Sequence, residues 1–251
     1  MTTLTRRILS SSMAGALALT LVACGSAGDA DAELAGDAIA AIPAPDGQQW
    51  TDVVTVSDEG GYIVGNPDAP LKLVEYASHT CGACANFSAQ AKPGIKEYVA
   101  TGVVSFEQRN LVRDPIDLTI ATLVRCGAKE NMQALSDQAW TNLEATFAAV
   151  NQNGAAYQAA GEAPLDQRFV GIAEAAGLID FFAARGLSAD QQRACLTDTD
   201  TIETIANNST SQAEELGINV TPTFLLNGRK LDVNQWRDVE PVLQRAGARS
   251  E

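Results

Sequence analysis

Two cysteines, Cys81 and Cys84, are spaced as C-x-x-C shortly after an apolar run, residues 71–76, that predicts a buried strand. The residues that follow, to about 100, favour a helix, so Cys81 is expected at a helix N-terminus. Unpaired backbone N–H groups and the positive end of the helix dipole would stabilise a negative sulfur there. The thiolate is the species that attacks disulfides, and Cys84 is close enough to attack in turn and close a ring. The spacing therefore predicts dithiol–disulfide exchange.

Two further cysteines, Cys126 and Cys195, fall in a part of the chain whose pattern is helical. In an exported protein, an even pair left over in this way favours a structural disulfide. Closing a loop of about seventy residues would stabilise the fold by roughly 4 kcal/mol, through entropy removed from the unfolded chain. The alternatives are two buried free thiols, or a four-cysteine zinc site completed by Cys81 and Cys84.

The first residues predict export. Arg6 and Arg7 precede an apolar stretch at 8–21 that is too short to span a bilayer comfortably, and Leu-Val-Ala-Cys follows directly at 21–24. This ending resembles a bacterial lipobox, in which the cysteine after the cleavage site is lipidated. We therefore expect a lipoprotein signal peptide at 1–23 and a lipid anchor at Cys24; the alternative is an ordinary cleaved signal with an incidental cysteine. Residues 24–49, rich in Ala, Gly and Asp, are expected to form a flexible linker.

The composition allows one sizeable core and argues against a nucleic-acid partner. The chain has 251 residues, of which 46% are hydrophobic, and a formal charge of −14. With Arg6 and Arg7 of the leader set aside, 15 basic residues stand against 31 acidic ones. A surface that acidic repels the phosphates of DNA and RNA.

The region after the linker begins with a strand–helix–strand pattern. Strands are expected at 61–65, 71–76 and 103–109, and a helix at 81–100 with a kink at Pro93. Glu75 is unusual in this pattern, because an acid in a central strand is costly unless it has a function.

Helices dominate from Asp114 to about 216. Asp114 and Pro115 are typical of an N-cap followed by proline at the first helical position, and Ser188 with Gln191 is typical of a capping box. Apolar side chains recur at helical spacing at Met132, Leu135, Ala139, Leu143 and Phe147. Large apolar residues that we assign to the core, and not to chemistry, are Met132, Trp140, Phe147, Phe181 and Phe182.

Strand character returns at 218–226, followed by a two-residue hairpin signal, Asn227-Gly228, and a closing helix at 233–246. This order of elements, with C-x-x-C at the first helix and Thr-Pro-Thr-Phe-Leu-Leu-Asn-Gly at 221–228, resembles the α/β thioredoxin fold. The long helical block resembles that of the DsbA-like thiol–disulfide oxidoreductases of the bacterial envelope. The resemblance divides the chain into a thioredoxin-fold N-terminal part at 50–112, a large α-helical insertion at 113–216, and a thioredoxin-fold C-terminal part at 217–247.

The resemblance implies roles for five residues. Cys81 would be the nucleophile and Cys84 the resolving cysteine. Pro222 would follow a cis peptide bond that faces the dithiol, and Thr221 would present its backbone to an incoming peptide. Glu75 would be a buried acid that exchanges a proton with Cys84. On the residues alone, a proline at an ordinary strand start and an edge-strand acid in solvent remain the alternatives.

The residues between the two cysteines depart from the pattern of the strongly oxidising members. Those proteins usually carry histidine or another residue that stabilises the thiolate, where this chain has Gly82 and Ala83. The only histidine, His79, lies two residues before Cys81, a place that favours an incidental histidine over one that tunes the thiol.

Together these features predict a thiol–disulfide oxidoreductase of the bacterial cell envelope that faces the periplasm, is lipid-anchored to a membrane and needs no cofactor or metal. The oxidising, disulfide-forming direction is favoured over the reducing one. Expected partners are exported cysteine-containing proteins and a membrane redox partner that re-oxidises or re-reduces the dithiol. The alternatives are a non-catalytic binding module or chaperone with a structural C-x-x-C bridge, and a delivery protein for metallocentre assembly.

Overall fold

The computed structural model describes residues 35–250. The expected signal peptide, the lipid anchor at Cys24 and the first part of the expected linker lie outside the described residues. Within residues 35–250, no helix combines the length and the apolar character needed to cross a bilayer.

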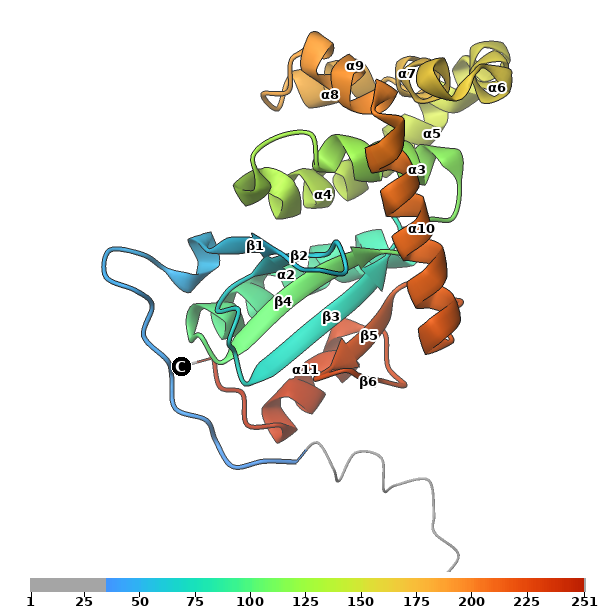
Figure 1. The fold of residues 1–251 in the computed structure, drawn as a ribbon. Coiled ribbons are helices and arrows are strands. Elements are labelled where there is room, and N and C mark those ends of the chain that lie inside the picture. Colours follow the sequence, from blue (N-terminus) through green and yellow to red (C-terminus); the bar gives the residue numbers. More distant parts are fainter. Residues whose placement is uncertain (1–34, 251) are drawn as a thin grey trace, which may run out of the picture. The chain divides into compact units, whose positions relative to one another are not determined.

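A six-stranded sheet, in the order β1-β2-β4-β3-β5-β6, organises this region (Figure 1). Its strands are β1 (Val54–Val56), β2 (Tyr62–Val64), β3 (Leu71–Ala77), β4 (Val104–Asn110), β5 (Thr223–Leu226) and β6 (Arg229–Lys230). β3 pairs in parallel with β4 and antiparallel with β5, and every other pairing is antiparallel. The strand that leads to the C-x-x-C is therefore paired on both sides, as its apolar sequence predicts.

The alternation of side chains along β3 decides what each face of the sheet contacts. Leu71 and Leu73 belong to a buried cluster with Phe87 of α2 (Gly82–Ala100) and with residues of α11 (Trp236–Arg245). Val74 and Tyr76, on the opposite face, pack with Ile218. By the same alternation Glu75 shares its face with Leu71 and Leu73, toward α2.

The insertion between β4 and β5 is entirely helical and has its own core. Its α-helices are α3 (Pro115–Val124), α4 (Met132–Thr141), α5 (Leu143–Gln152), α6 (Gly154–Glu162), α7 (Leu165–Ala175), α8 (Leu178–Ala183), α9 (Ala189–Thr197) and α10 (Thr199–Leu216). Two short 3₁₀ helices are η1 (Trp50–Asp52), before the sheet, and η2 (Lys129–Asn131), which leads into α4. In Figure 1, α10 descends from this block toward the sheet. The predicted α/β fold with a large helical insertion is confirmed.

The expected N-cap residues Asp114 and Ser188 are confirmed, but the Gln191 side chain donates to the Cys126 carbonyl instead of closing a capping box. The Asp114 side chain accepts from the N–H of Asp117 at the start of α3, with Pro115 in the first turn, and Ser188 accepts from the N–H of Gln191 at the start of α9. These side chains satisfy N–H groups that have no partner within the helix, and so they fix where each helix begins.

Local structure differs from the expectations in four places. β1 was not predicted, since three residues at a sheet edge leave little pattern. β5 begins at Thr223 and not at 218, because the chain turns through a cis Thr221–Pro222 peptide bond. The apolar repeat continued to Phe147 breaks at Asn142, where α4 ends, and Phe147 is 39% exposed instead of lying in the core.

The fourth concerns the expected flexible linker, whose described part is held against the domain. The backbone N–H of Ile39 donates to the carbonyl of Gly247, and the N–H of Ile42 to that of Thr101. Both isoleucine side chains pack against the core beneath α2 and α11. Two apolar residues that can be buried are enough to hold a segment that composition alone assigns to a tether.

Candidate active site

Cys81 is the N-cap residue of α2. Its backbone is extended, with φ −93° and ψ 115°, and its sulfur accepts a hydrogen bond from the backbone N–H of Cys84 at 3.4 Å. A hydrogen bond from the Cys84 thiol, together with contacts to Thr221 and to the N–H groups of Cys84 and Ala83, outweighs burial and lowers the pKa of Cys81 to about 5. The helix start therefore holds a thiolate at neutral pH.

Cys84 has the opposite environment. It is fully buried, whereas Cys81 keeps 6% of its surface exposed. Burial, the hydrogen bond with Cys81 and the negative charge of Glu75 raise the pKa of Cys84 above the ordinary value for a thiol. The two thiols are unbonded in this structure. One sulfur is thus ready to attack or to be attacked, while the other stays protonated until it is needed.

The segment that contains Pro222 faces the dithiol. The Thr221–Pro222 peptide bond is cis, and the Thr221 carbonyl oxygen lies 3.4 Å from the sulfur of Cys81, which donates to it only when it is protonated. Arg113, at the start of the helical insertion, donates from Nη1 to the Thr221 hydroxyl at 3.3 Å. Thr221 is itself buried, while Val220, directly before this pair, is 59% exposed.

Glu75 lies in the middle of β3, opposite Gln108 of β4 and Phe224 of β5, and is 1% exposed. Among the described residues its Oε1 has no hydrogen-bond partner. Burial, and after it the charges of Asp137 and Cys81, raise the pKa of Glu75 well above the ordinary value for a carboxyl. A buried carboxyl with a raised pKa holds its proton to higher pH than an ordinary one, and it can both give and accept a proton.

Trp140, assigned from the sequence to the core alone, is a neighbour of the site. It lies in α4 and forms a buried cluster with Cys81 and Cys84. Its indole N–H donates to the backbone carbonyl of Ser78 at 2.9 Å, and its ring stacks on His79 with centroids 5.3 Å apart. The insertion thus supplies the wall against which the dithiol packs.

The turn at 78–80, which leads into Cys81, is held by carboxylates at the start of α3. The backbone N–H of His79 donates to Oδ1 of Asp117 at 2.7 Å. The Thr80 hydroxyl donates to Oδ2 of Asp114, the N-cap residue of the same helix, at 2.5 Å. The first helix of the insertion therefore fixes the backbone that positions the nucleophile.

His79 belongs to a buried polar network on this wall. Its Nε2 lies 2.6 Å from the Ser136 hydroxyl, which also receives hydrogen bonds from Tyr62 Oη and Gln108 Nε2, each at 2.8 Å. All four residues are fully buried. These contacts make His79 an anchor of the turn. Since Gly82 and Ala83 have no side-chain donors of their own, no side chain between the two cysteines donates to the thiolate.

Cys126 and Cys195 are joined in a disulfide with an S–S distance of 2.05 Å. Their sulfurs are therefore not available as ligands, and the alternative of a four-cysteine zinc site is wrong. Within residues 35–250, no group of three or more potential metal-ligating side chains is found.

The structure brings together Cys81, Cys84, Glu75, Thr221 and Pro222, which the resemblance had named, and adds residues that sequence reasoning missed. Arg113, Trp140 and Asp137 contact this group from the insertion or act on its charge. Their sequence surroundings carry no motif. The arrangement allows a substrate sulfur to exchange with Cys81, Cys84 to resolve the mixed disulfide, and Glu75 to carry the proton.

Comparisons with known proteins agree with this geometry. A family model described as Thioredoxin matches residues 57–245, a span that contains the dithiol, the insertion and the cis proline. A candidate protein-disulfide oxidoreductase of Rickettsia bellii is 22% identical over 190 residues, or 75% of this chain. The chain spans 65% of the length of this relative and of a similar one from Rickettsia typhi.

Solved structures show the same architecture. The crystal structure of a protein-disulfide isomerase from Novosphingobium aromaticivorans matches with a TM-score of 0.69 and 27% identity, covering 73% of this chain and 96% of that one. Wolbachia pipientis alpha-DsbA1 matches in fold with a TM-score of 0.61 and 21% identity, over 76% and 93% of the two chains. The chain therefore belongs to the thioredoxin family, with the helix-inserted fold of its DsbA-like members.

Proposed function

We propose that this protein is a thiol–disulfide oxidoreductase that forms disulfides in exported proteins. The observation that carries the proposal is the pairing of unlike thiols: Cys81, with a pKa of about 5 at a helix N-terminus, and the buried, protonated Cys84 beside Glu75. The Rickettsia bellii and Novosphingobium relatives, whose names describe protein-disulfide chemistry, support the same reaction class.

The acidity of Cys81 supports the oxidising direction. A fold that stabilises the Cys81 thiolate stabilises the reduced dithiol, and a stabilised reduced form makes the disulfide a stronger oxidant. Although Gly82 and Ala83 offer no side-chain donor, Cys84 and the backbone N–H groups already supply hydrogen bonds to the sulfur.

The reaction uses the site in two exchanges. A substrate thiolate attacks Cys81 of the oxidised protein, the Cys81–Cys84 bond breaks, and Cys84 leaves with the electron pair and takes a proton from Glu75. A second substrate thiolate then attacks the substrate sulfur of the mixed disulfide. Cys81 leaves as a thiolate, and the substrate carries away the new disulfide while the protein is reduced.

The reduction potential tests this proposal. The purified protein is equilibrated with glutathione buffers, and its dithiol fraction is measured by mass after alkylation. We expect a potential between about −120 and −200 mV, the range of strong oxidants and isomerases. A value near about −270 mV, as in thioredoxin, would contradict the oxidising direction alone. A Cys81–Cys84 bridge that never equilibrates would instead favour the non-catalytic binding module.

The same proposal places the protein at the envelope membrane, facing the periplasm and anchored through Cys24. The lipobox-like ending Leu-Val-Ala-Cys supports the anchor. Expressing cells are given a labelled fatty acid, with Cys24→Ala as the matched variant. We expect label in the wild-type protein and none in the variant. Absence of label from the wild-type protein would contradict the anchor. A membrane redox partner that re-oxidises the dithiol completes the cycle.

A further inference from the structure

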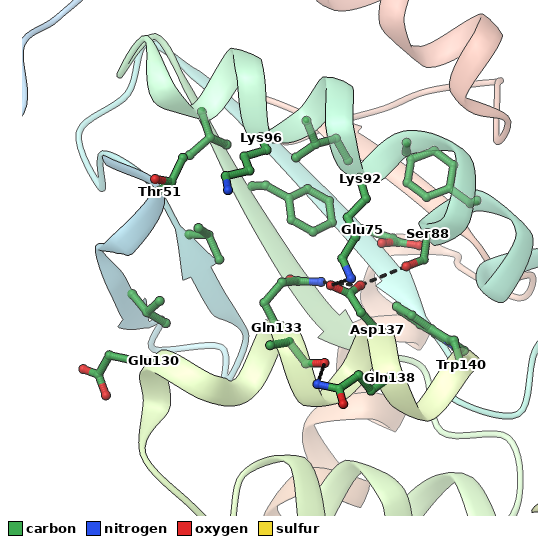
Figure 2. Close-up of a pocket in the computed structure, with 18 residues that line it drawn as sticks. Thr51, Glu75, Ser88, Lys92, Lys96, Glu130, Gln133, Asp137, Gln138 and Trp140 are labelled. Atoms are coloured by element: carbon green, nitrogen blue, oxygen red, sulfur yellow. Dashed lines mark hydrogen bonds and ion pairs between the residues drawn. The ribbon is translucent and has the colours of Figure 1, made fainter. Parts of the chain in front are cut away.

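A cleft of about 440 Å³ opens between α2, α4 and the sheet (Figure 2). Most of its lining is apolar, but one side carries polar groups. Figure 2 shows Glu75, Ser88, Lys92, Gln133 and Asp137 gathered on that side, where α2 faces α4. The cleft thus extends from the surface to the acid that serves Cys84.

Asp137 is the second buried acid of this cleft. It lies on α4 and its side chain is 4% exposed. Oδ1 accepts from the Ser88 hydroxyl at 2.8 Å and from Gln133 Nε2 at 3.1 Å, and Oδ2 lies 2.5 Å from Nζ of Lys92. The Lys92 side chain is 54% exposed, so this ion pair connects the cleft interior with solvent.

Glu75 and Asp137 are the buried members among the five ionisable residues that line the cleft. The others, Lys92, Lys96 and Glu130, are exposed. Glu75 has an unpartnered Oε1 and almost no exposed surface, so a proton that it gives to Cys84 has to be replaced through the interior. On its polar side, a cleft of this size has room for water molecules that link the two carboxyl groups.

We propose that Asp137 is a proton-relay residue, which passes protons between solvent and Glu75 through this cleft. The inference rests on the proposed function and deepens it. When a substrate thiolate opens the Cys81–Cys84 bond, Cys84 leaves with the electron pair and takes the proton of Glu75. The Glu75 carboxylate then regains a proton from a cleft water, which Asp137 resupplies from the solvent. The proton count balances without any other reactant.

The charged and titratable groups that face Asp137 come from three elements. Lys92 projects from α2, Glu75 from β3 and Tyr62 from β2. Lys92 forms an ion pair with Asp137, and the charge of Asp137 adds to burial in raising the pKa of Glu75. Both buried carboxyl groups thus line the same cleft, and one of them is paired with an exposed lysine.

Infrared spectroscopy tests the relay without requiring activity. The carbonyl band of protonated Glu75, assigned with Glu75→Gln, is followed after the reduced protein is mixed into heavy water. We expect Asp137→Asn to slow hydrogen–deuterium exchange of this carboxyl at least about a hundredfold, at the low end of what a positioned proton-transfer group contributes. Glu130→Gln, an exposed acid on the same cleft, is the matched control and should exchange at the wild-type rate.

A second variant keeps the test valid if Asp137→Asn fails to fold. Ala134 lies exposed on α4 and lines the cleft, so Ala134→Trp covers the path without removing a polar group. It should also slow exchange at Glu75. Wild-type exchange in both variants would overturn the relay, as would equal slowing in Glu130→Gln.

A kinetic readout separates this inference from the proposed function. The oxidised protein is mixed with a dithiol peptide, and its fluorescence is followed because Trp140 packs against both cysteines. We expect Asp137→Asn to react more slowly and formate to restore part of the rate. If the wild-type protein does not react, the proposed function fails and the infrared result alone decides the relay. A slow reaction of Asp137→Asn that formate does not accelerate would contradict the relay.

Discussion

The chain contains two pairs of cysteines, and they lie at opposite ends of helices. Cys81 is the N-cap of α2, where N–H groups point at its sulfur. Cys126 follows the end of α3, and Cys195 lies in the last turn of α9. The sulfur of Cys126 is 3.3 Å from the carbonyl oxygen of Gln191. Helix N–H groups thus face the sulfur of Cys81, beside the Thr221 carbonyl, whereas the partners of the second pair among the described residues are carbonyl oxygens.

This difference in surroundings gives the same side chain two uses. A sulfur that faces donors and the positive end of a helix is stabilised as a thiolate, so it attacks and leaves readily. A sulfur that faces carbonyl oxygens is a poorer thiolate and a poorer leaving group, so its disulfide resists exchange. The comparison assigns chemistry to the first pair and structure to the second.

Removing Cys81 is the most severe way to break the comparison. Cys81→Ser should abolish disulfide exchange with a dithiol peptide, because the mixed disulfide can no longer form. Cys126→Ala/Cys195→Ala should exchange at close to the wild-type rate. Both proteins are assayed by the oxidation of a fluorescent dithiol peptide. Loss of exchange in the double variant at a temperature where it is folded would remove the distinction between the two pairs.

Removing the second pair of cysteines should affect stability and not exchange. The disulfide closes a sequence separation of 69 residues, so its loss in Cys126→Ala/Cys195→Ala should lower the free energy of unfolding by about 4 kcal/mol. Urea unfolding of the oxidised proteins measures this change, with Cys81→Ser/Cys84→Ser as the matched pair. Equal destabilisation by the two double variants would mean that both bridges are structural.

The sequence predicts the first pair well because its determinants are local. The strand, the spacing of Cys81 and Cys84, and the Thr221-Pro222 pair can each be recognised from a few consecutive residues, although the last lies 140 residues from Cys81. The capping residue Asp114 is predicted for the same reason, since N-cap preference is a property of one turn.

The surroundings of the pair could not be predicted. Trp140, Arg113 and Asp137 reach the site because the insertion packs on the sheet, and no local pattern encodes that contact. Trp140 has the helical spacing of a core residue and is one, but it packs on the dithiol as well. The break between α4 and α5 was missed because apolar spacing continued across Asn142 to the exposed Phe147.

Ser136 sharpens the comparison by testing whether the insertion holds the turn before Cys81. Ser136→Ala leaves His79, Tyr62 and Gln108 without their shared partner in a buried site. The loss should lower the free energy of unfolding by about 1–3 kcal/mol. Ser211→Ala, on the exposed face of α10, is the control and should change it by less than about 0.5 kcal/mol. An unchanged Ser136→Ala would mean that water replaces the hydroxyl.

The smallest expected effect is on the alkylation rate of Cys81, which reports the acidity of its thiol. With a pKa of about 5, against 9.0 for an ordinary thiol, Cys81 is mostly thiolate at pH 6. That is about a thousandfold more thiolate than an ordinary thiol has, but the lower nucleophilicity of an acidic thiolate offsets about a hundredfold of it. Iodoacetamide should therefore modify Cys81 about tenfold faster than the same cysteine in the unfolded protein.

The alkylation rate of Cys81 should also depend on pH in a defined direction. Because folding lowers the pKa of Cys81, its alkylation rate should stay level from pH 8 down to about 6 and fall as the pH drops through about 5. The unfolded protein should instead lose rate steadily below its ordinary pKa of 9.0. Cys84, which is fully buried, should stay unmodified throughout. A folded protein whose rate falls in step with the unfolded one would show that the helix start does not distinguish Cys81 from any other thiol.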